Sequence, residues 1–122
     1  MKIIVVAMAR NEDDVIESFV RWHARHADHL IVMDHASRDR TREILESLRD
    51  EGLPLEVHVD DRAELNQSRA TLALAKRAAC ELDADWVLPF DVDEFLVADP
   101  PDPVRLRLEK LEAGALHCVD WQ

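Results

Sequence analysis

The stretch that decides the fold is "IIVVAMA", residues 3–9. It is an unbroken apolar run, rich in β-branched side chains and without alternating polar residues. Such a run is typical of a strand buried on both faces, as strands in a parallel sheet are. We therefore predict a fully buried strand over residues 3–9.

Helical spacing of apolar residues follows this strand. The pattern runs from residue 12 to about residue 27, with Asn11 as the expected cap and Glu12 and Asp13 as first-turn acids favoured by the helix dipole. Further strands are predicted at 29–33, 55–59 and 86–90, and further helices at 40–51, ended by Gly52, and at 67–82. Ser37 or Thr41, with Asp39 nearby, is expected to cap the helix at 40–51.

The end of the chain continues the same alternation. An amphipathic helix is predicted over 104–113 and a fifth strand over 115–121. Strands alternating with helices imply right-handed crossovers and a mostly parallel sheet. The sequence thus predicts an α/β fold, Rossmann-like with helices on both faces, forming a single domain over residues 1–122.

Composition narrows the class of protein. The chain has 122 residues, 48% of them hydrophobic, and a formal net charge of −11. The apolar fraction is typical of a globular domain, and the negative charge argues against nucleic acid as a partner. The apolar run at the start is too short to span a bilayer, and charged residues follow it directly. We expect a soluble, cytoplasmic protein without a transmembrane segment.

Histidine and cysteine spacing does not indicate a zinc or redox centre. His23 and His26 lie one helical turn apart, but the sequence offers no obvious third ligand, and Trp22 beside them indicates a packed face. Cys80 falls within an apolar helical pattern, far from Cys118. We expect Cys80 to be a buried, reduced thiol.

Polar segments follow three of the predicted strands. They are "ARNED" (9–13), "DHASRD" (34–39) and "DVDE" (91–94). Parallel α/β sheets bind ligands outside the carboxyl ends of their strands, where the strand order reverses. The three segments are therefore expected to meet at one binding site.

Two aspartates in the last of these segments are the strongest chemical signal. Residues two apart in an extended strand end point the same way, so Asp91 and Asp93 should face the cleft while Val92 turns to the core. Adjacent like charges raise each other's free energy, and a cation would offset the repulsion. Carboxylate oxygens, with room for water and phosphate, suit Mg²⁺ or Mn²⁺. We predict a divalent metal site at Asp91 and Asp93.

The other two segments, and the start of the helix at 67–82, supply candidate nucleotide-binding residues. Asp34 closes the second predicted strand, where a carboxylate can accept hydrogen bonds from a base or ribose. Arg10 and Asn11 follow the first strand, which ends at Ala9, and the backbone groups of residues 9–11 are placed to line a base pocket. Arg69, in the first turn of its helix, is suited to phosphate oxygens or to stacking on the base.

With these residues in view, the chain resembles the nucleotide-sugar-binding N-terminal half of a family-2-type glycosyltransferase with the GT-A fold. The resemblance covers residues 1 to about 98. It rests on the segments "VVAMARNEDDVIESFVRWH", "IVMDHASRDRT", "NQSRA" and "DADWVLPFDVDEFL".

The resemblance implies roles for individual residues. Asp34 would contact the nucleotide base, and Ala9 and Arg10 would line its pocket. Asp91 would lie near the ribose and the metal, and Asp93 would ligate Mn²⁺ or Mg²⁺ on the donor diphosphate. Arg69 would approach the nucleotide. The donor would be a nucleotide-activated sugar, most often a UDP-sugar, transferred to an acceptor hydroxyl with inversion.

The resemblance leaves the catalytic base unassigned. In the family this base, usually a carboxylate, lies in an acceptor-binding region beyond the point where the present chain stops. Glu94 and Asp120 are acids near the expected edge, but neither is assigned the role. The domain is therefore expected to be truncated, and the acceptor is unknown.

Two other functions remain open, together with the oligomeric state. One alternative is a non-catalytic nucleotide-sugar-binding module, and the other is a phosphatase of the haloacid dehalogenase type with Asp91 as nucleophile. The phosphatase motif normally follows the first strand, whereas here three strands precede it. An unpaired edge strand with exposed apolar surface favours self-association, so a homo-oligomer is expected.

Overall fold

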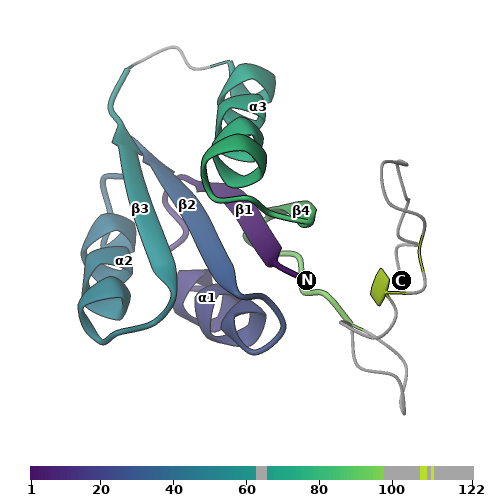
Figure 1. Ribbon diagram of the computed structural model, residues 1–122. Coiled ribbons are helices and arrows are strands. Elements are labelled where there is room, and N and C mark those ends of the chain that lie inside the picture. Colours follow the sequence, from purple (N-terminus) through teal and green to yellow (C-terminus); the bar gives the residue numbers. More distant parts are fainter. Residues whose placement is uncertain (63–65, 98–107, 110, 112–122) are drawn as a thin grey trace.

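A four-stranded parallel sheet carries helices on both faces (Figure 1). The computed structural model describes residues 1–62, 66–97, 108, 109 and 111. The strands are β1 (Ile3–Ala9), β2 (His29–His35), β3 (Leu55–Asp60) and β4 (Trp86–Asp91), and the helices are α1 (Ile16–Ala24), α2 (Thr41–Asp50), α3 (Gln67–Lys76) and the π-helical turn η1 (Arg77–Glu81). The predicted α/β class is confirmed. The helix predicted at 104–113 lies outside the described residues except at positions 108, 109 and 111, and the strand predicted at 115–121 lies wholly outside them.

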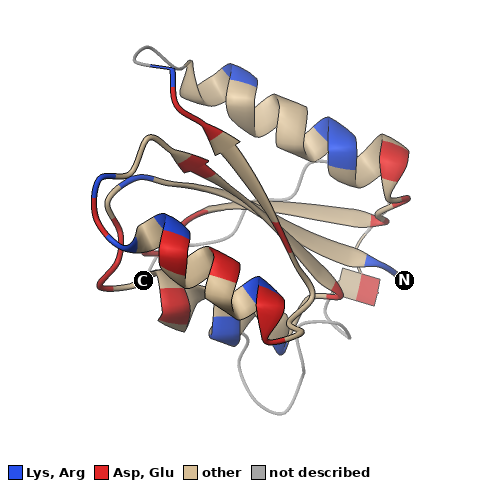
Figure 2. Cartoon of the chain, turned by 90° about the vertical axis from the view of Figure 1, so that its left-hand side faces the viewer, with Lys and Arg blue, Asp and Glu red and all other residues tan. Residues whose placement is uncertain are grey.

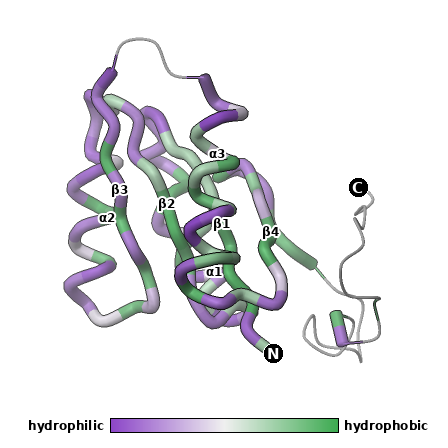
Figure 3. The backbone as a smooth tube through the Cα atoms, turned by 45° about the horizontal axis from the view of Figure 1, so that its top comes forward, coloured by the Kyte–Doolittle hydropathy of each residue, from purple (hydrophilic) through white to green (hydrophobic). Residues whose placement is uncertain are grey.

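The two faces of β1 build two separate cores. Side chains at odd positions, such as Val5, pack with Phe19 of α1 and Leu45 of α2. Side chains at even positions, such as Val6, pack instead with Leu74 of α3. Hydrophobic residues accordingly run along the central strands, while the loops are largely hydrophilic (Figure 3). This burial on both sides explains why residues 3–9 form an unbroken apolar run.

The strand order is β3-β2-β1-β4. The chain adds β2 and β3 on one side of β1 and places β4 on the other, so the order reverses between β1 and β4. In the register of the sheet, Met8 pairs with Asp91, and Ala9 pairs with Asp34. The carboxyl ends of these three strands therefore lie side by side.

The start of helix α1 differs from the sequence prediction, whereas the end of helix α2 agrees with it. Helix α1 begins at Ile16, not at residue 12, and Asn11 is not its cap. Asn11 has a φ of 53°, a left-handed conformation that Asn tolerates better than most residues, and it turns the chain out of β1. Helix α2 ends as predicted before Gly52, whose φ of 102° suits glycine.

The expected burial of Cys80 is wrong. Helix α3 gives way at Arg77 to η1, in which Ala78 is the fully buried residue. Cys80 lies two residues further on, about half a turn away, and its side chain is exposed. Apolar spacing predicted the helix here but assigned the wrong residue to its inner face.

Charged residues lie mainly on the helices and loops, whereas the strands carry few of them until their ends (Figure 2). Among the described residues, no helix is both long and apolar enough to cross a bilayer.

Candidate functional site

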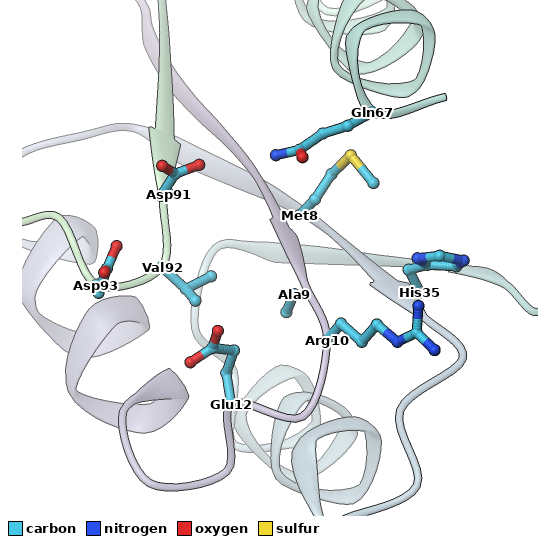
Figure 4. A pocket seen from close by; sticks show the side chains of 9 residues that line it. All are labelled: Met8, Ala9, Arg10, Glu12, His35, Gln67, Asp91, Val92 and Asp93. Atoms are coloured by element: carbon cyan, nitrogen blue, oxygen red, sulfur yellow. The ribbon is translucent and has the colours of Figure 1, made fainter. Parts of the chain in front are cut away.

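A cavity of about 510 Å³ lies at the point where the strand order reverses. It is lined by residues from the ends of β1, β2 and β4 and the start of α3: Met8, Ala9, Arg10, Glu12, His35, Gln67, Asp91, Val92 and Asp93 (Figure 4). The three polar segments that follow β1, β2 and β4 thus all contribute to one cavity, as predicted.

The wall formed by β4 and the residues after it carries the two predicted aspartates. Asp91 and Asp93 both line the cavity and are exposed, while Val92 between them is 4% exposed and belongs to the core. Glu94 closes the segment, because its side chain accepts a hydrogen bond from the Asp91 amide at 2.6 Å and its own amide donates to the Asp91 carbonyl. We refer to Asp91–Glu94 as the acidic turn.

The carboxylates of Asp91 and Asp93 have no counter-charge in the described part of the chain. Neither forms an ion pair or a side-chain hydrogen bond with the residues that the structure describes. Most other carboxylates near the strand ends do have partners, such as Asp60 with Arg62. The acidic turn therefore presents two unneutralised groups to the cavity.

Glu12 is a third carboxyl group at the cavity, which sequence analysis placed in a helix. Its backbone amide donates to the Thr41 hydroxyl at 2.8 Å, and its carbonyl accepts the amides of Val15 and Ile16. The side chain points towards the acidic turn (Figure 4). Burial raises the pKa of Glu12, and neighbouring carboxylates, Asp93 among them, raise it further. Burial is the larger cause of this raised pKa, and the neighbouring carboxylates add a smaller negative contribution at this wall of the cavity.

This donor set fits a divalent cation. Carboxylate oxygens are the ligands preferred by Mg²⁺ and Mn²⁺, and a cation would relieve the repulsion at the wall. The described residues contain no group of three or more His, Cys, Asp or Glu side chains arranged to hold a metal ion. A metal here would thus be held by Asp91 and Asp93 with water and phosphate oxygens completing its shell, as is common for Mg²⁺.

The opposite wall is formed by β1 and β2. Ala9 and Arg10 line it, as the sequence suggested, and Met8 and His35 also contribute (Figure 4). His35 is held in place because its Nε2 lies 2.8 Å from the Arg62 carbonyl. His35 directly follows Asp34, a predicted site residue, so the sequence placed it at the correct strand end. The sequence did not show that its side chain faces the cavity.

Asp34 is buried beside this wall and does not line the cavity. Its Oδ2 accepts hydrogen bonds from Nε and Nη2 of Arg42, at 3.1 and 3.0 Å, and a longer one from the Ser37 amide. Its Oδ1 is buried and has no hydrogen-bond partner among the described residues. Buried polar atoms are nearly always paired, so this leftover acceptor at a strand end stands out among the described residues.

Asn11 connects two loops and does not line the cavity. Its amide donates to the Ser37 hydroxyl at 3.0 Å, and its side-chain Oδ1 accepts the Arg38 amide at 2.8 Å. Neither Ser37 nor Thr41 caps α2, because Arg40 occupies the N-cap position without a side-chain cap bond. Ser37, Asp39 and Thr41 instead connect the two loops and the start of α2 by hydrogen bonds. The predicted contact of Asn11 with a nucleotide is untested and stays a prediction.

Arg69 lies where predicted along the chain, in the first turn of α3, but its side chain does not line the cavity. Asn66 caps this helix by accepting the Arg69 amide at 3.0 Å. The residue of α3 that reaches the cavity is Gln67 (Figure 4). A helix places residues two apart on different faces, so Gln67 and Arg69 cannot both face the cavity. The sequence motif therefore located the correct helical turn, but Gln67 is the side chain that lines the cavity.

Comparison with solved structures identifies the fold. The chain is similar to the mannosyltransferase PcManGT from Pyrobaculum calidifontis, whose structure is a complex with GDP-Man and Mn²⁺. The TM-score is 0.66 and the sequence identity is 19%. The match covers 80% of the present chain but only 29% of that protein, which is therefore much longer than the matched domain. The common architecture is the GT-A, Rossmann-like fold.

Comparison with protein families gives the same answer from sequence. No curated protein matches the chain. A family model described as "Glycosyl transferase family 2" matches residues 4–119, which is nearly the whole sequence and includes every residue that lines the cavity. The chain belongs to glycosyl transferase family 2.

Proposed function

We propose that this domain binds the nucleotide-diphosphate sugar in a metal-dependent glycosyl transfer. The observation that carries the proposal is the acidic turn, where Asp91 and Asp93 face a cavity at the strand-order reversal without a protein partner among the described residues. An acidic wall repels a diphosphate, so both can share the cavity only with a cation between them. A bound Mn²⁺ or Mg²⁺ would supply charge stabilisation for the departing diphosphate.

The far side of the cavity is proposed to hold the nucleoside. Arg10 and His35 lie opposite the acidic turn, and Ala9 offers backbone groups between them (Figure 4). Asp34, fixed by Arg42, has one acceptor oxygen left for a base N–H, provided that a small movement at the end of β2 exposes it. Gln67 lines the cavity, and Arg69 lies in the same first turn of α3. Both are proposed to approach a sugar or phosphate that enters from that side.

The proposed reaction is transfer with inversion. An acceptor hydroxyl oxygen forms a bond to the anomeric carbon, and the bond from that carbon to the diphosphate oxygen breaks in line. The hydroxyl proton passes to a general base, a role that we assign to none of the described residues. Glu94 is not assigned this role, because its Oε1 accepts the Asp91 amide and serves to close the acidic turn.

The identity of the nucleotide base in the donor is the finer part of the proposal. Resemblance of the sequence motifs favours a UDP-sugar, whereas the similar structure holds GDP-Man. Both nucleotides share the diphosphate that the acidic turn would bind through the cation. A panel of UDP, GDP, ADP and CDP, scored by thermal shift with and without Mn²⁺, separates them, because a ligand that binds only the native state raises Tm.

Isothermal calorimetry on the Asp93→Asn variant tests the proposal most directly. The substitution removes one charge with little change in volume, so we expect affinity for the preferred nucleotide diphosphate in Mn²⁺ to fall by more than about tenfold, which is ~1.4 kcal/mol. Asp50→Asn, at the end of α2, is the matched control with the same change of charge. Equal affinities in Asp93→Asn and the unsubstituted protein would refute the site.

Turnover separates the proposed enzyme from its alternatives. Hydrolysis of a bound sugar donor supports a transferase, whereas tight binding without any turnover would indicate a binding module. Activity on a simple phosphomonoester that is lost in Asp91→Asn would indicate a phosphatase instead.

A further inference from the structure

Helix α1 holds the residues that follow the acidic turn. The Nε1 of Trp22 donates a hydrogen bond to the Leu96 carbonyl at 2.8 Å. The Leu96 amide donates to Nε2 of His23 at 3.2 Å. Two consecutive helix residues therefore bind both polar groups of one peptide residue more than 70 positions away in the chain. This pair of contacts is a specific arrangement and not general core packing.

The protonation state of His23 follows from its neighbours. Its Nδ1 lies 2.9 Å from the Phe19 carbonyl, which can only accept, so Nδ1 carries the hydrogen. Nε2 is then the acceptor that the Leu96 amide needs. His23 is fully buried, and this burial lowers its pKa, with a small further effect from His26. The imidazole is thus kept neutral, the only form that can accept from Leu96.

The His23 ring also contacts the chain on both sides of the acidic turn. Its centroid lies 5.1 Å from that of Phe90, directly before Asp91, and 5.9 Å from that of Phe95, directly after Glu94. Phe95 makes further edge contacts with Phe19 and Trp22. One imidazole therefore joins the two ends of the acidic turn.

We propose that His23 and Trp22 are positioning residues, which hold the two ends of the acidic turn so that Asp91 and Asp93 face one cation. The inference rests on the proposed function, because it concerns how that metal site is shaped. The two aspartate side chains repel each other and have no partner among the described residues, so only the backbone of the acidic turn sets their spacing. That backbone is held by the Asp91–Glu94 hydrogen bonds within the turn and, at its ends, by the contacts of His23 and Trp22.

Metal affinity is the property that this arrangement should control. Groups that orient metal ligands without touching the metal typically change affinity by about 10- to 100-fold when removed. His23→Phe keeps an aromatic ring in the core but removes the acceptor for the Leu96 amide. His23→Gln removes the ring but restores an acceptor at similar reach. Trp22→Phe removes only the donor to the Leu96 carbonyl, at a half-buried site that tolerates the change.

The experiment measures Mn²⁺ binding to the whole chain by electron paramagnetic resonance of the free ion, at about pH 8, where histidine is neutral. We expect His23→Phe to bind Mn²⁺ about 10-fold or more weakly, and Trp22→Phe to weaken binding several-fold. His23→Gln should recover most of the affinity lost in His23→Phe. If His23→Phe fails to fold, Trp22→Phe and His23→Gln still test the inference.

A destabilised control separates positioning from general stability. Leu48→Ala, in α2, opens the same core far from the acidic turn and should lower Tm without changing Mn²⁺ affinity. Unchanged Mn²⁺ affinity in both His23→Phe and Trp22→Phe, with a lowered Tm, would overturn the inference and leave the metal site standing. Absence of Mn²⁺ binding in the unsubstituted protein would instead overturn the proposed function.

Discussion

The loops after β1 and β2 and the acidic turn after β4 border the same cavity, but their polar groups are used in opposite ways. In the first pair of loops, polar side chains bond mainly to backbone amides of the neighbouring loop. The Ser37 hydroxyl accepts the Asn11 amide, the Asn11 side chain accepts the Arg38 amide, and Asp39 accepts the Asp13 amide and the Thr41 hydroxyl. In the acidic turn, the carboxylates of Asp91 and Asp93 bond to nothing in the described part of the chain. Satisfied polar groups hold the scaffold, and unsatisfied groups are available to a ligand.

The same comparison explains the different electrostatics. Burial alone would raise the pKa of Asp39, but hydrogen bonds from Thr41 and from the Asp13 amide outweigh it and hold that pKa below its ordinary value. Glu12, which faces the acidic turn, has a raised pKa because burial and neighbouring carboxylates both act against its charge. A negative charge is thus stabilised at Asp39, in the loop after β2, and destabilised at Glu12, where the loop after β1 faces the acidic turn.

The largest effect on stability should come from removing hydrogen bonds in the loops after β1 and β2, where the polar groups have partners. Asp39→Ala removes the acceptor for the Thr41 amide and hydroxyl at the start of α2. Loss of such a contact at a helix start costs about 1–2 kcal/mol. Urea denaturation should show this decrease, and Asp93→Ala, in the unsatisfied acidic turn, should show none. An equal loss of stability in the two variants would contradict the comparison.

A smaller loss is expected at Asn11. Asn11→Gly keeps the positive φ but removes the hydrogen bond to the Arg38 amide, which should cost about 1 kcal/mol in unfolding free energy. Asn11→Ala should cost about 1 kcal/mol more, because alanine is strained at positive φ. Urea denaturation of both variants measures the difference. Nearly equal stabilities of the glycine and alanine variants would mean that the left-handed turn is not maintained.

The mildest effect should be a gradual dependence on pH. Burial lowers the pKa of His23, so the unfolded chain binds a proton more readily than the folded chain. Unfolding free energy should therefore fall as the pH decreases through the ordinary histidine value of about 6.5, and should level off below the folded pKa. Melting curves from about pH 8 to pH 5 test this, and the decrease should be smaller in His23→Gln. A rise in stability over that range would contradict the buried neutral imidazole.

The elements that depend on local pattern were predicted well. The strand at residues 3–9 was predicted with its observed bounds, because a strand that is buried on both faces has an unbroken run of apolar residues. Asp91 and Asp93 were placed at the cavity because they follow a strand directly and lie two residues apart. Helix α1 was predicted four residues too early, since the tertiary contact from the Glu12 amide to Thr41 holds that segment in a loop.

The partners within the site could not be predicted. Glu12 and Gln67 line the cavity only because the sheet order brings their segments next to β4. Arg42 was not considered as a partner of Asp34, although it lies in the first turn of α2, directly after the loop that Asp34 opens. His23 was expected in a packed face, which is confirmed, but its bond to Leu96 depends on a segment far along the chain.

The sequence by itself determined the alternation of strands and helices, the buried central strand and the acidic pair at a strand end. These follow from side-chain periodicity and backbone propensity, which act over a few neighbouring residues. Only the tertiary structure decided which carboxylates are neutralised and which remain free to bind a cation. That distinction depends on hydrogen-bond partners drawn from distant segments, and those partners meet only after the sheet has formed.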